Sequence, residues 1–357
     1  MNYPRLEINC TKIIHNTQYL MAELHLKAIS VTPVTKASSG HPLLAQLFIH
    51  AGATMLADSR VENMQRMRCS GISIPLMLIR TPMLSQIAGV ISDCSISLNT
   101  EIEVIQALSD EAQRTNSDHS VIIMVELGDL REGVMAKDLV DFIRRIVLLP
   151  NIIIKGIGAN LACRYGIAPD EQKMAVLSAL ADEIEGTFDI HLDIISGGNS
   201  ASLQWALAHT GETRINHLRI GEAIFFGYES LYQETLAGLQ TDAMILTAEV
   251  IESNLKPSLP WGKRGNNAFG EQQPIEDRGF VTQAILALGR QDVDVSGLTP
   301  PQGITIVSST SDHLIVETLG EKLLVGQKIS FSLNYSGFLS AMSSQHVYKL
   351  FSYPTVS

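Results

Sequence analysis

The sequence predicts an α/β fold, a (β/α)8 TIM barrel followed by a smaller, mainly β domain. From about residue 28 to residue 225, short apolar runs alternate regularly with helix-like segments, and after about residue 235 this alternation stops. The runs are also continuously apolar, which is typical of parallel strands that are covered on both faces. We therefore expect the barrel in residues 1–235 and the mainly β domain in residues 236–357.

Eight runs predict the strands of the barrel. They are residues 28–35, 54–57, 74–78, 94–98, 121–127, 152–158, 190–195 and 215–220. The clearest helix between them is expected from Asp170 to Glu185, with Pro169 opening it and Gly186 closing it. Eight β/α units within about 200 residues favour a closed barrel over an open sheet.

The predicted second domain has another pattern, in which glycine, proline, asparagine and aspartate separate the apolar runs. Its strand-like runs are residues 243–252, 280–289, 303–309, 313–319 and 328–335. No long helical pattern lies between them, so a mainly β domain is expected. The segment from Lys256 to Asp277 is rich in proline, glycine and polar residues, which predicts a long loop.

Composition excludes several classes of partner and location. The 357 residues carry a net charge of −11 without a cluster of lysine and arginine, so no nucleic-acid partner is expected. No apolar run is long enough to span a bilayer, and the first residues lack the pattern of a signal peptide, so no membrane partner is expected. The four cysteines are far apart in the sequence, which indicates a reduced, cytoplasmic protein.

The active site of a (β/α)8 barrel lies at the C-terminal ends of its strands, so the polar residues there are the first candidates for function. These residues are Lys36, Asp58, Arg60, Arg80, Asn99, Asp129, Arg131, Asn160, the segment Ser196–Ser200, Arg219 and Glu222. The loops after strands seven and eight commonly bind phosphate in such barrels. They correspond here to Ser196–Ser200, with Gly198, Asn199 and Ser200, and to the segment around Gly221.

Three of these features together suggest pyridoxal phosphate, a cofactor that needs an amine, a phosphate cup and a partner for its ring nitrogen. Lys36 would supply the amine, Ser196–Ser200 the cup and Arg219 the ring partner. Each feature also has an ordinary explanation: a solvated lysine at a strand end, a glycine-rich turn and a structural salt bridge. Only the combination favours a cofactor site.

At these residues the sequence resembles the fold-type III pyridoxal-phosphate enzymes typified by alanine racemase, and within them the ornithine racemase-like branch. The matching stretches are VTKxxxG around Lys36, ADSRVEN (57–63), SLNTEIE (97–103), LGDLREG (127–133), GIGANLAC (156–163), SGGNS (196–200), LRIGEAI (218–224), EDRGF (276–280), LGRQDVD (288–294) and SSTSDHLIV (308–316). They cover nearly the whole chain, so the ordered set is more specific than any single stretch.

The resemblance implies roles for these residues. Lys36 holds the cofactor as an internal aldimine, and Arg219 faces the pyridine nitrogen and keeps it unprotonated, which favours racemisation over transamination. Ser200 and the backbone at Gly221 and Glu222 take the phosphate. The resemblance also places Arg131 near the phenolic oxygen and Asn160 where alanine racemases carry a histidine beside the ring.

The chain departs from alanine racemases at several positions. The loop after Lys36, residues 37–41, lacks their tyrosine. Arg290 stands where their second catalytic tyrosine belongs, and arginine stays protonated, so it is no ordinary base. The ornithine branch commonly has cysteine at the place of Ser39 and aspartate at that of His41, so the substrate is least defined here.

Racemisation needs a proton donor or acceptor on each face of the substrate, and Lys36 can serve one face. For the other face the candidates are Asp292, His313, Tyr335 and Cys163. Each also has a structural explanation: a turn cap, a sheet residue, a core side chain and a small buried hydrophobe. In the family the second domain of one subunit completes the partner's site, which implies a homodimer.

The expected function is racemisation of an amino acid, with ornithine or another basic amino acid favoured as the small-molecule substrate. The alternatives are a non-catalytic pyridoxal-phosphate carrier and a D-amino-acid aldolase or dehydratase of the same fold. Carriers typically consist of the barrel alone, so the residues after 235 favour an enzyme. The aldolases use a metal, and His313 and His346 are isolated in the sequence, so no metal site is expected.

Overall fold

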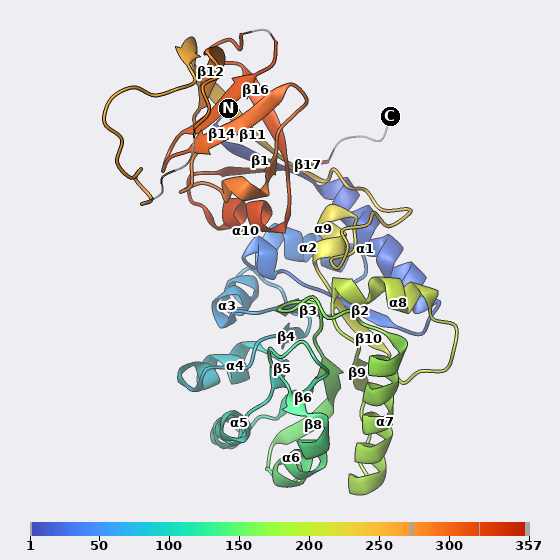
Figure 1. Ribbon diagram of the computed structural model, residues 1–357. Coiled ribbons are helices and arrows are strands. Elements are labelled where there is room, and N and C mark those ends of the chain that lie inside the picture. Colours follow the sequence, from blue (N-terminus) through green and yellow to red (C-terminus); the bar gives the residue numbers. More distant parts are fainter. Residues whose placement is uncertain (1, 271, 273–274, 321, 354–357) are drawn as a thin grey trace. The chain divides into compact units, whose positions relative to one another are not determined.

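The computed structural model describes residues 2–270, 272, 275–320 and 322–353. The chain forms two compact units. One unit runs from Thr11 to Thr241, and the other combines the residues up to Cys10 with those from Asp242 onward. Figure 1 shows the first unit in blue to yellow and most of the second in orange to red.

The first unit is a barrel of parallel strands, as predicted. Its sheet has the order β2-β10-β9-β8-β6-β5-β4-β3, and a parallel bridge between Val34 and Ala57 joins its two ends. The short β7 (Val134–Met135) pairs only with β6. The barrel strands are β2 (Ser30–Pro33), β3 (Leu56–Asp58), β4 (Leu76–Leu78), β5 (Ile96–Asn99), β6 (His119–Glu126), β8 (Ile152–Ala159), β9 (Ile194–Ser196) and β10 (His217–Ile220). All eight predicted strands are confirmed.

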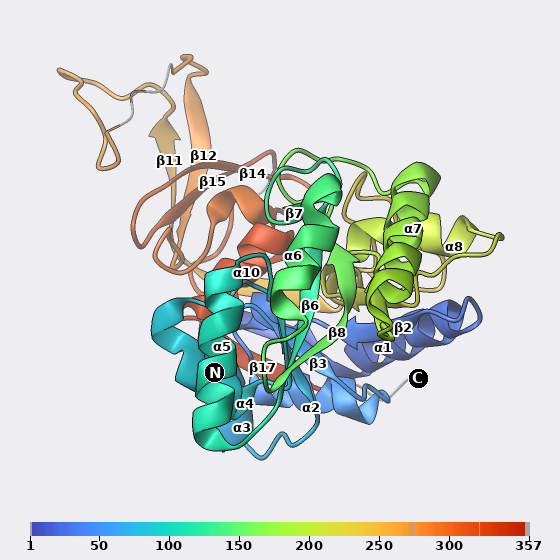
Figure 2. The same cartoon turned by 90° about the horizontal axis from the view of Figure 1, so that it is seen from below.

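Helices surround the barrel, and Figure 2 shows α5, α6 and α7 on its outside. The helices associated with this unit are α1 (Cys10–His25), α2 (Pro42–His50), α3 (Val61–Cys69), α4 (Ile87–Asp93), α5 (Ile102–Thr115), α6 (Leu139–Ile146), α7 (Glu171–Phe188), α8 (Leu203–Ala208) and α9 (Glu222–Phe226). Buried apolar side chains from neighbouring strands, among them Ala57, Met77, Leu98 and Ile122, form one core cluster. The strands are therefore apolar on both faces because helices cover one and this core fills the other.

Helix α7 starts close to its expected position and ends later than predicted. The carboxylate of Asp170 caps it by accepting a hydrogen bond from the Lys173 amide at 2.8 Å. The prediction that Gly186 closes the helix was wrong, because the helix continues to Phe188 and ends at Asp189, whose φ is 52°. A glycine costs a helix about 1 kcal/mol but does not stop it.

The second unit is mainly β, as predicted. Its sheet has the order β13-β16-β11-β12-β15-β14, and β1 pairs with both β11 and β17. The strands are β1 (Arg5–Asn9), β11 (Met244–Pro257), β12 (Phe280–Leu286), β13 (Leu298–Thr299), β14 (Ile304–Ser309), β15 (Leu314–Thr318), β16 (Lys328–Leu333) and β17 (Tyr348–Ser352). The expected division placed residues 1–10 with the barrel segment, whereas Arg5–Asn9 form a strand of this sheet.

The second unit also contains a helix that the sequence pattern did not reveal, α10 (Tyr335–Ser343). It follows β16 directly, and the side chain of Asn334 caps it by accepting a hydrogen bond from the Gly337 amide at 3.0 Å. Its buried residues Phe338, Ala341 and Met342 have helical spacing. The predicted run 328–335 extended past the end of the strand and concealed this start.

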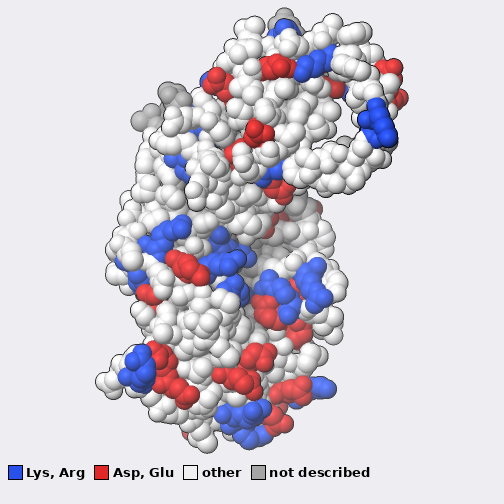
Figure 3. Space-filling view, turned by 90° about the vertical axis from the view of Figure 1, so that its left-hand side faces the viewer, with Lys and Arg blue, Asp and Glu red and all other residues white. Residues whose placement is uncertain are grey.

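Charged residues of both signs are interspersed on the surface shown in Figure 3. No helix in the described ranges is long and apolar enough to cross a membrane.

Candidate cofactor and active site

The order of the strands brings the predicted site residues to neighbouring positions. Strand β10 lies between β2 and β9, with Arg219 paired to Thr32 and His217 paired to Ser196. Strand β8 follows β9 in the sheet. Because all these strands are parallel, their C-terminal ends form one continuous edge, with Lys36, Glu222, Ser200 and Asn160 just beyond it.

Lys36 begins a short 3-10 turn, Lys36–Ser38, directly after β2. The residue before it, Thr35, is fully buried and donates a hydrogen bond from its hydroxyl to the Asp58 carboxylate at 2.6 Å. The Thr35 amide also binds the Ala57 carbonyl at 2.8 Å. Burial raises the pKa of Asp58, an effect that its hydrogen bonds with Thr35 and Asn63 partly oppose. The backbone beneath Lys36 is therefore held by strand β3.

The loop after Lys36 is packed against helix α3. Gly40 has a φ of 61°, and a Cβ at this position would lie 2.6 Å from the Cβ of Asn63. Arg66 donates a hydrogen bond to the carbonyl of Ser39 at 2.9 Å. The close approach to Asn63 leaves no room for a side chain at Gly40, which explains the glycine at the end of the ASSG segment.

Arg219 is buried, with 3% of its surface exposed. Its Nη2 donates to the Ala159 carbonyl at 2.9 Å, and its Nη1 donates to the hydroxyl of Ser196. Burial lowers the pKa of Arg219 to about 10, so its guanidinium stays charged near neutral pH. Both of these hydrogen-bond partners are neutral oxygen atoms. These two contacts are therefore not the structural salt bridge that would be the ordinary explanation for an arginine at this position.

His217, two residues before Arg219, extends the same network. Its Nδ1 lies 2.8 Å from the Ser196 hydroxyl, and its Nε2 lies 2.8 Å from that of Thr32. Burial, and then the charge of Arg219, lower the pKa of His217 to about 3, so the imidazole is neutral. The network thus joins β2, β9 and β10 and fixes the orientation of Arg219.

The segment Ser196–Ser200 forms a tight turn between β9 and the 3-10 turn Ser200–Ser202. Gly198 has a φ of 122°, and a Cβ there would lie 2.6 Å from the Ser202 hydroxyl. The Ser200 hydroxyl accepts a hydrogen bond from the Ala223 amide at 3.2 Å. This contact joins the turn to the first residues of α9, where backbone amides lack helical partners and suit an anion.

Glu222, the first residue of α9, combines a backbone amide with a partly buried acidic side chain. Burial raises the pKa of its carboxyl, and the hydrogen bond with Ser230 and the charge of Lys36 partly oppose this rise. Nearby, a Cβ on Gly221 would lie 3.1 Å from the Cβ of Val34. The backbone at Gly221 and Glu222 therefore lies close to the strand that leads to Lys36.

Asn160 follows β8 and lies beside the turn Ser196–Ser200. Its Oδ1 accepts a hydrogen bond from Asn199 at 3.2 Å, and Asn199 also donates to the Leu161 carbonyl at 2.9 Å and contacts the Cys163 sulfur at 3.4 Å. Within the described ranges, Nδ2 of Asn160 is buried and has no hydrogen-bond partner. A buried donor without a partner costs free energy, so it is available for a ligand.

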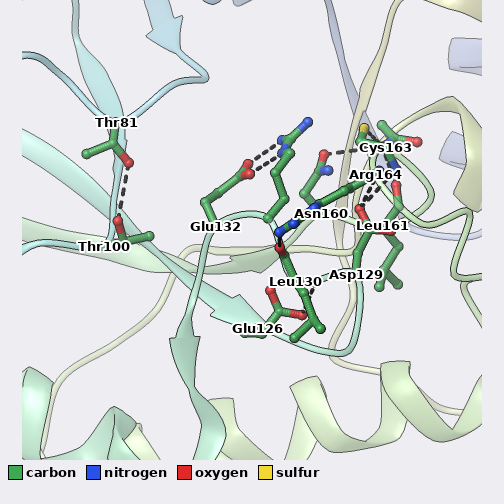
Figure 4. A network of polar contacts seen from close by, with 12 residues as sticks. Thr81, Thr100, Glu126, Asp129, Leu130, Glu132, Asn160, Leu161, Cys163 and Arg164 are labelled. Carbon is green, nitrogen blue, oxygen red and sulfur yellow. Dashed lines mark hydrogen bonds and ion pairs between the residues drawn. The ribbon is translucent and has the colours of Figure 1, made fainter.

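Arg131 lies in the loop after β6, where its guanidinium forms a two-pronged ion pair with the neighbouring Glu132. Figure 4 shows Glu132, Asn160 and Cys163 in this region. The interaction of Arg131 with the phenolic oxygen of a cofactor stays a prediction.

The site residues fit pyridoxal phosphate. Lys36 supplies an amine, the turn Ser196–Ser200 with the start of α9 supplies a cup, and Arg219 supplies a buried cation. Gly198 lacks space for a Cβ, so the cup depends on glycine, and Nδ2 of Asn160 leaves a donor for a polar ring substituent.

The candidates for the second acid or base lie in the other unit, except Cys163. Asp292 is 6% exposed and accepts a hydrogen bond from the Gly289 amide at 2.9 Å within its own turn. His313 contacts the Asp312 carboxylate at 2.9 Å. The amides of Arg290 and Gln291 bind the carbonyls of Thr310 and Ser311 at 2.9 and 3.0 Å, so the turns of Asp292 and His313 lie side by side.

Tyr335 begins α10, and Cys163 is exposed beside Asn199. The catalytic role of Asp292, His313, Tyr335 or Cys163 stays a prediction. Within the described ranges, no group of three or more histidine, cysteine or acidic side chains could hold a metal ion.

Sequence reasoning missed the role of three buried residues. His217 was not singled out, although its spacing from Arg219 places both side chains on one face of β10. Asp58 and Asp129 were recognised as strand-end residues without a function. The first supports Thr35, and the second accepts hydrogen bonds from the loop after β8. These hydrogen-bond partners of Asp58 and Asp129 are far away in the sequence, so no local pattern reveals these contacts.

Comparison with known proteins supports the fold and the family. The family model "Alanine racemase, N-terminal domain" matches residues 8–229. The chain is 36% identical to ornithine racemase from Acetoanaerobium sticklandii over 97% of this chain and 99% of that protein. It is 35% identical to lysine racemase from Thermotoga maritima over 98% of this chain and 99% of that protein.

Solved structures share the architecture at lower identity. Alanine racemase from Streptomyces lavendulae superposes with a TM-score of 0.77 at 16% identity, covering 98% of this chain and 96% of that one. A D-threonine aldolase from Filomicrobium marinum superposes with a TM-score of 0.72 at 13% identity, covering 96% and 89%. These likenesses show the fold alone, whereas the family model and the two full-length relatives show that this chain belongs to the alanine racemase family.

Proposed function

We propose that this protein is a pyridoxal-phosphate-dependent racemase that acts on a basic amino acid, with ornithine and lysine as the first candidates. The observation that carries the proposal is the placement of an amine, a buried cation and a glycine-dependent cup on the adjacent strands β2, β10 and β9. Chance would not commonly place all three at one edge of one barrel.

The relatives support the reaction and the substrate class. Two proteins that match the chain over nearly its whole length are named as an ornithine racemase and a lysine racemase. Both matches include the second unit, which favours an enzyme over a barrel that only carries a cofactor. Both names refer to amino acids with a cationic side chain, so we assign a substrate of this kind.

When bound, pyridoxal phosphate withdraws electrons from the α carbon of the amino acid attached to it, which makes the α proton removable. Lys36 anchors the cofactor and then takes or returns the α proton with its Nζ on one face of the substrate. The backbone held by Thr35 and Asp58 fixes the starting position of this amine. Ser200 and the amides of Gly221 and Glu222 would hold the phosphate group.

Arg219 directs the reaction toward racemisation. Its guanidinium remains charged despite burial, because its pKa is lowered only to about 10. If Arg219 faced the ring nitrogen of the cofactor, this fixed cation would oppose protonation of that nitrogen and would favour return of the proton to the α carbon. Neutral His217 holds Ser196, which in turn accepts a hydrogen bond from Arg219.

The proton on the opposite face requires a second group, and we propose that a homodimer supplies it. Asp292, His313 and Tyr335 of the second unit are the candidates, and they would act in the site of the partner subunit. The pairing of the Asp292 turn with the His313 turn supports a shared position for these two side chains.

We also propose a cytoplasmic location. All four cysteines, Cys10, Cys69, Cys94 and Cys163, are free thiols. This is the usual state in a reducing compartment.

The first test combines a spectrum with an exchange assay. The purified protein is expected to be yellow and to lose its visible absorption band in Lys36→Ala, whereas Lys155→Ala should keep the band, because Lys155 pairs with Asp193. An unchanged band in Lys36→Ala would contradict the cofactor assignment.

The second test measures α-proton exchange in deuterated water with both enantiomers of ornithine, lysine, arginine and alanine. Exchange with inversion of a basic amino acid supports the proposal. Inversion confined to alanine would contradict the substrate class, and a lack of exchange with every amino acid would favour a carrier.

A further inference from the structure

A buried carboxylate in the loop after β6 has no role in the reaction proposed above. Asp129 is 0% exposed. It accepts hydrogen bonds from three consecutive amides, those of Cys163 at 3.1 Å, Arg164 at 2.9 Å and Tyr165 at 3.0 Å. These amides belong to residues 160–170, the segment between β8 and α7 that we call the β8 loop. One side chain therefore folds the first half of this loop.

A second contact ties the same two segments together. Arg164 donates a hydrogen bond from Nη1 to the carbonyl of Leu130, the residue after Asp129. Leu130 and Ala162 both have left-handed backbones, with φ values of 52° and 63°. Residues other than glycine seldom adopt this conformation unless their surroundings hold them in it. Asp129 binds the amide of Cys163, next to Ala162, and Arg164 binds the carbonyl of Leu130; Figure 4 shows these side chains close together.

The β8 loop, which Asp129 binds at residues 163–165, begins with Asn160. Asn160 receives a hydrogen bond from Asn199 of the phosphate cup, and its own Nδ2 is buried without a partner in the described part of the chain. Asn199 also binds the carbonyl of Leu161 at 2.9 Å. Residues 160 and 161 of the β8 loop are thus fixed to Asn199 of the cup, and residues 163–165 are fixed to Asp129.

We infer that Asp129 is a positioning residue, which shapes the β8 loop so that Asn160 presents its unpaired amide donor to the bound cofactor. This inference rests on the proposed function. The competing explanation is that Asp129 only stabilises a surface loop. Direct binding of substrate by Asp129 does not fit, because its two oxygen atoms already accept three amide hydrogen bonds and are shielded from solvent.

The test replaces Asp129 by asparagine, which keeps the size of the side chain but offers only one acceptor oxygen. Asp170→Asn is the matched control, because Asp170 also accepts an amide hydrogen bond, from Lys173 at 2.8 Å, at the other end of the β8 loop. Asn160→Ala removes the donor itself without touching the amides of residues 163–165. Hydrogen exchange of these amides, retention of pyridoxal phosphate, the absorption band of the bound cofactor, and kcat and KM are measured for each variant.

In Asp129→Asn, amide exchange at residues 163–165 is expected to rise about tenfold or more. The absorption band should shift, and kcat/KM should fall by about 10²-fold, because small displacements of a bound group are costly. Asn160→Ala should reproduce the spectral and kinetic changes with unchanged amide exchange. Asp170→Asn should leave the spectrum and kcat/KM as in the parent protein.

Two results would overturn the inference. One is unchanged amide exchange in Asp129→Asn, and the other is faster exchange with an unaltered spectrum and kcat/KM, which is the result for a purely stabilising residue. If Asp129→Asn does not fold, Arg164→Met decides by the same measurements, since Arg164 is exposed. If the parent protein takes up no pyridoxal phosphate, the proposed function fails as well; if it does, only the role of Asp129 is at stake.

Discussion

His217 and Arg219 lie two residues apart on β10, and burial affects their charges differently. It lowers the pKa of both side chains, to about 3 for His217 and to about 10 for Arg219. Because arginine starts from a much higher value, it keeps its proton at neutral pH while histidine loses it. The same buried strand therefore carries one fixed cation and one neutral hydrogen-bonding ring.

At the residue scale we predict that stability falls in mildly acidic solution. Burial lowers the pKa of His119 to about 4, whereas an unfolded histidine has a pKa near 6.5. Between pH 6.5 and pH 4 the histidine binds a proton in the unfolded chain but not in the folded chain, so the free energy of unfolding decreases as the pH falls. Between pH 7 and pH 5 the loss is about 2 kcal/mol for each such histidine.

Urea unfolding at these two pH values measures this loss. His119→Gln should remove the part of this loss in unfolding free energy that His119 causes. His25→Gln serves as the control, because His25 is exposed. An identical pH dependence in His119→Gln and the parent protein would show that His119 is not the source.

At the scale of elements, glycine has opposite effects in a strand and in a helix. Gly156 in β8 faces the backbone of β9, where a Cβ would lie 1.8 Å from the Ile194 carbonyl oxygen. Gly186 lies inside α7, and a Cβ there would meet no atom within 4 Å. The first glycine permits two barrel strands to pair, while the second only adds flexibility to a helix.

This difference gives a matched pair of variants. Gly156→Ala is expected to destabilise the protein by about 3 kcal/mol or more, because the strands must separate to accept the methyl group. Gly186→Ala should stabilise it by about 0.5–1 kcal/mol through better helix propensity. Thermal and urea unfolding of both variants measures the two effects, and a Gly156→Ala protein as stable as the parent would contradict the close approach of β8 and β9.

At the scale of the whole molecule, the candidate groups for the proposed function are divided between the two units. The barrel unit holds Lys36, the cup and Arg219, whereas Asp292, His313 and Tyr335 belong to the mainly β unit. The mainly β unit is built from both ends of the chain, since β1 pairs with β11 and β17. A racemase with one acid or base from each unit needs both in one site, and we propose that two subunits share them.

Mixing of inactive variants tests this arrangement. Asp292→Asn, His313→Gln and Tyr335→Phe are first assayed singly, and the one that loses activity is then mixed with Lys36→Ala under conditions that exchange subunits. If the sites are shared, a mixed dimer has one intact site, so activity should recover to about a quarter of the parent value. No recovery, despite mass-spectrometric proof of mixed dimers, would place both groups in the same subunit.

Much of the fold could be predicted from the sequence, since the regular apolar runs revealed all eight barrel strands and the main strands of the second unit. The features that escaped prediction depend on partners far away in the sequence. Residues 5–9 become a strand only because β11 and β17 lie beside them. Helix α10 is short and follows a strand directly, and Gly186 does not end α7, because a single glycine cannot outweigh a continuing apolar face.

The sequence by itself determined the barrel, the candidates Lys36, Ser196–Ser200 and Arg219, and the resemblance that suggested pyridoxal phosphate. These conclusions rest on local patterns, because strand periodicity and residue type are legible along the chain. Only the tertiary structure decided that Arg219 is held by Ser196 and Ala159, that Asp58 supports Thr35, and that Asp129 folds the β8 loop. Such contacts join side chains and backbone atoms that are brought together solely by the pairing order of the strands.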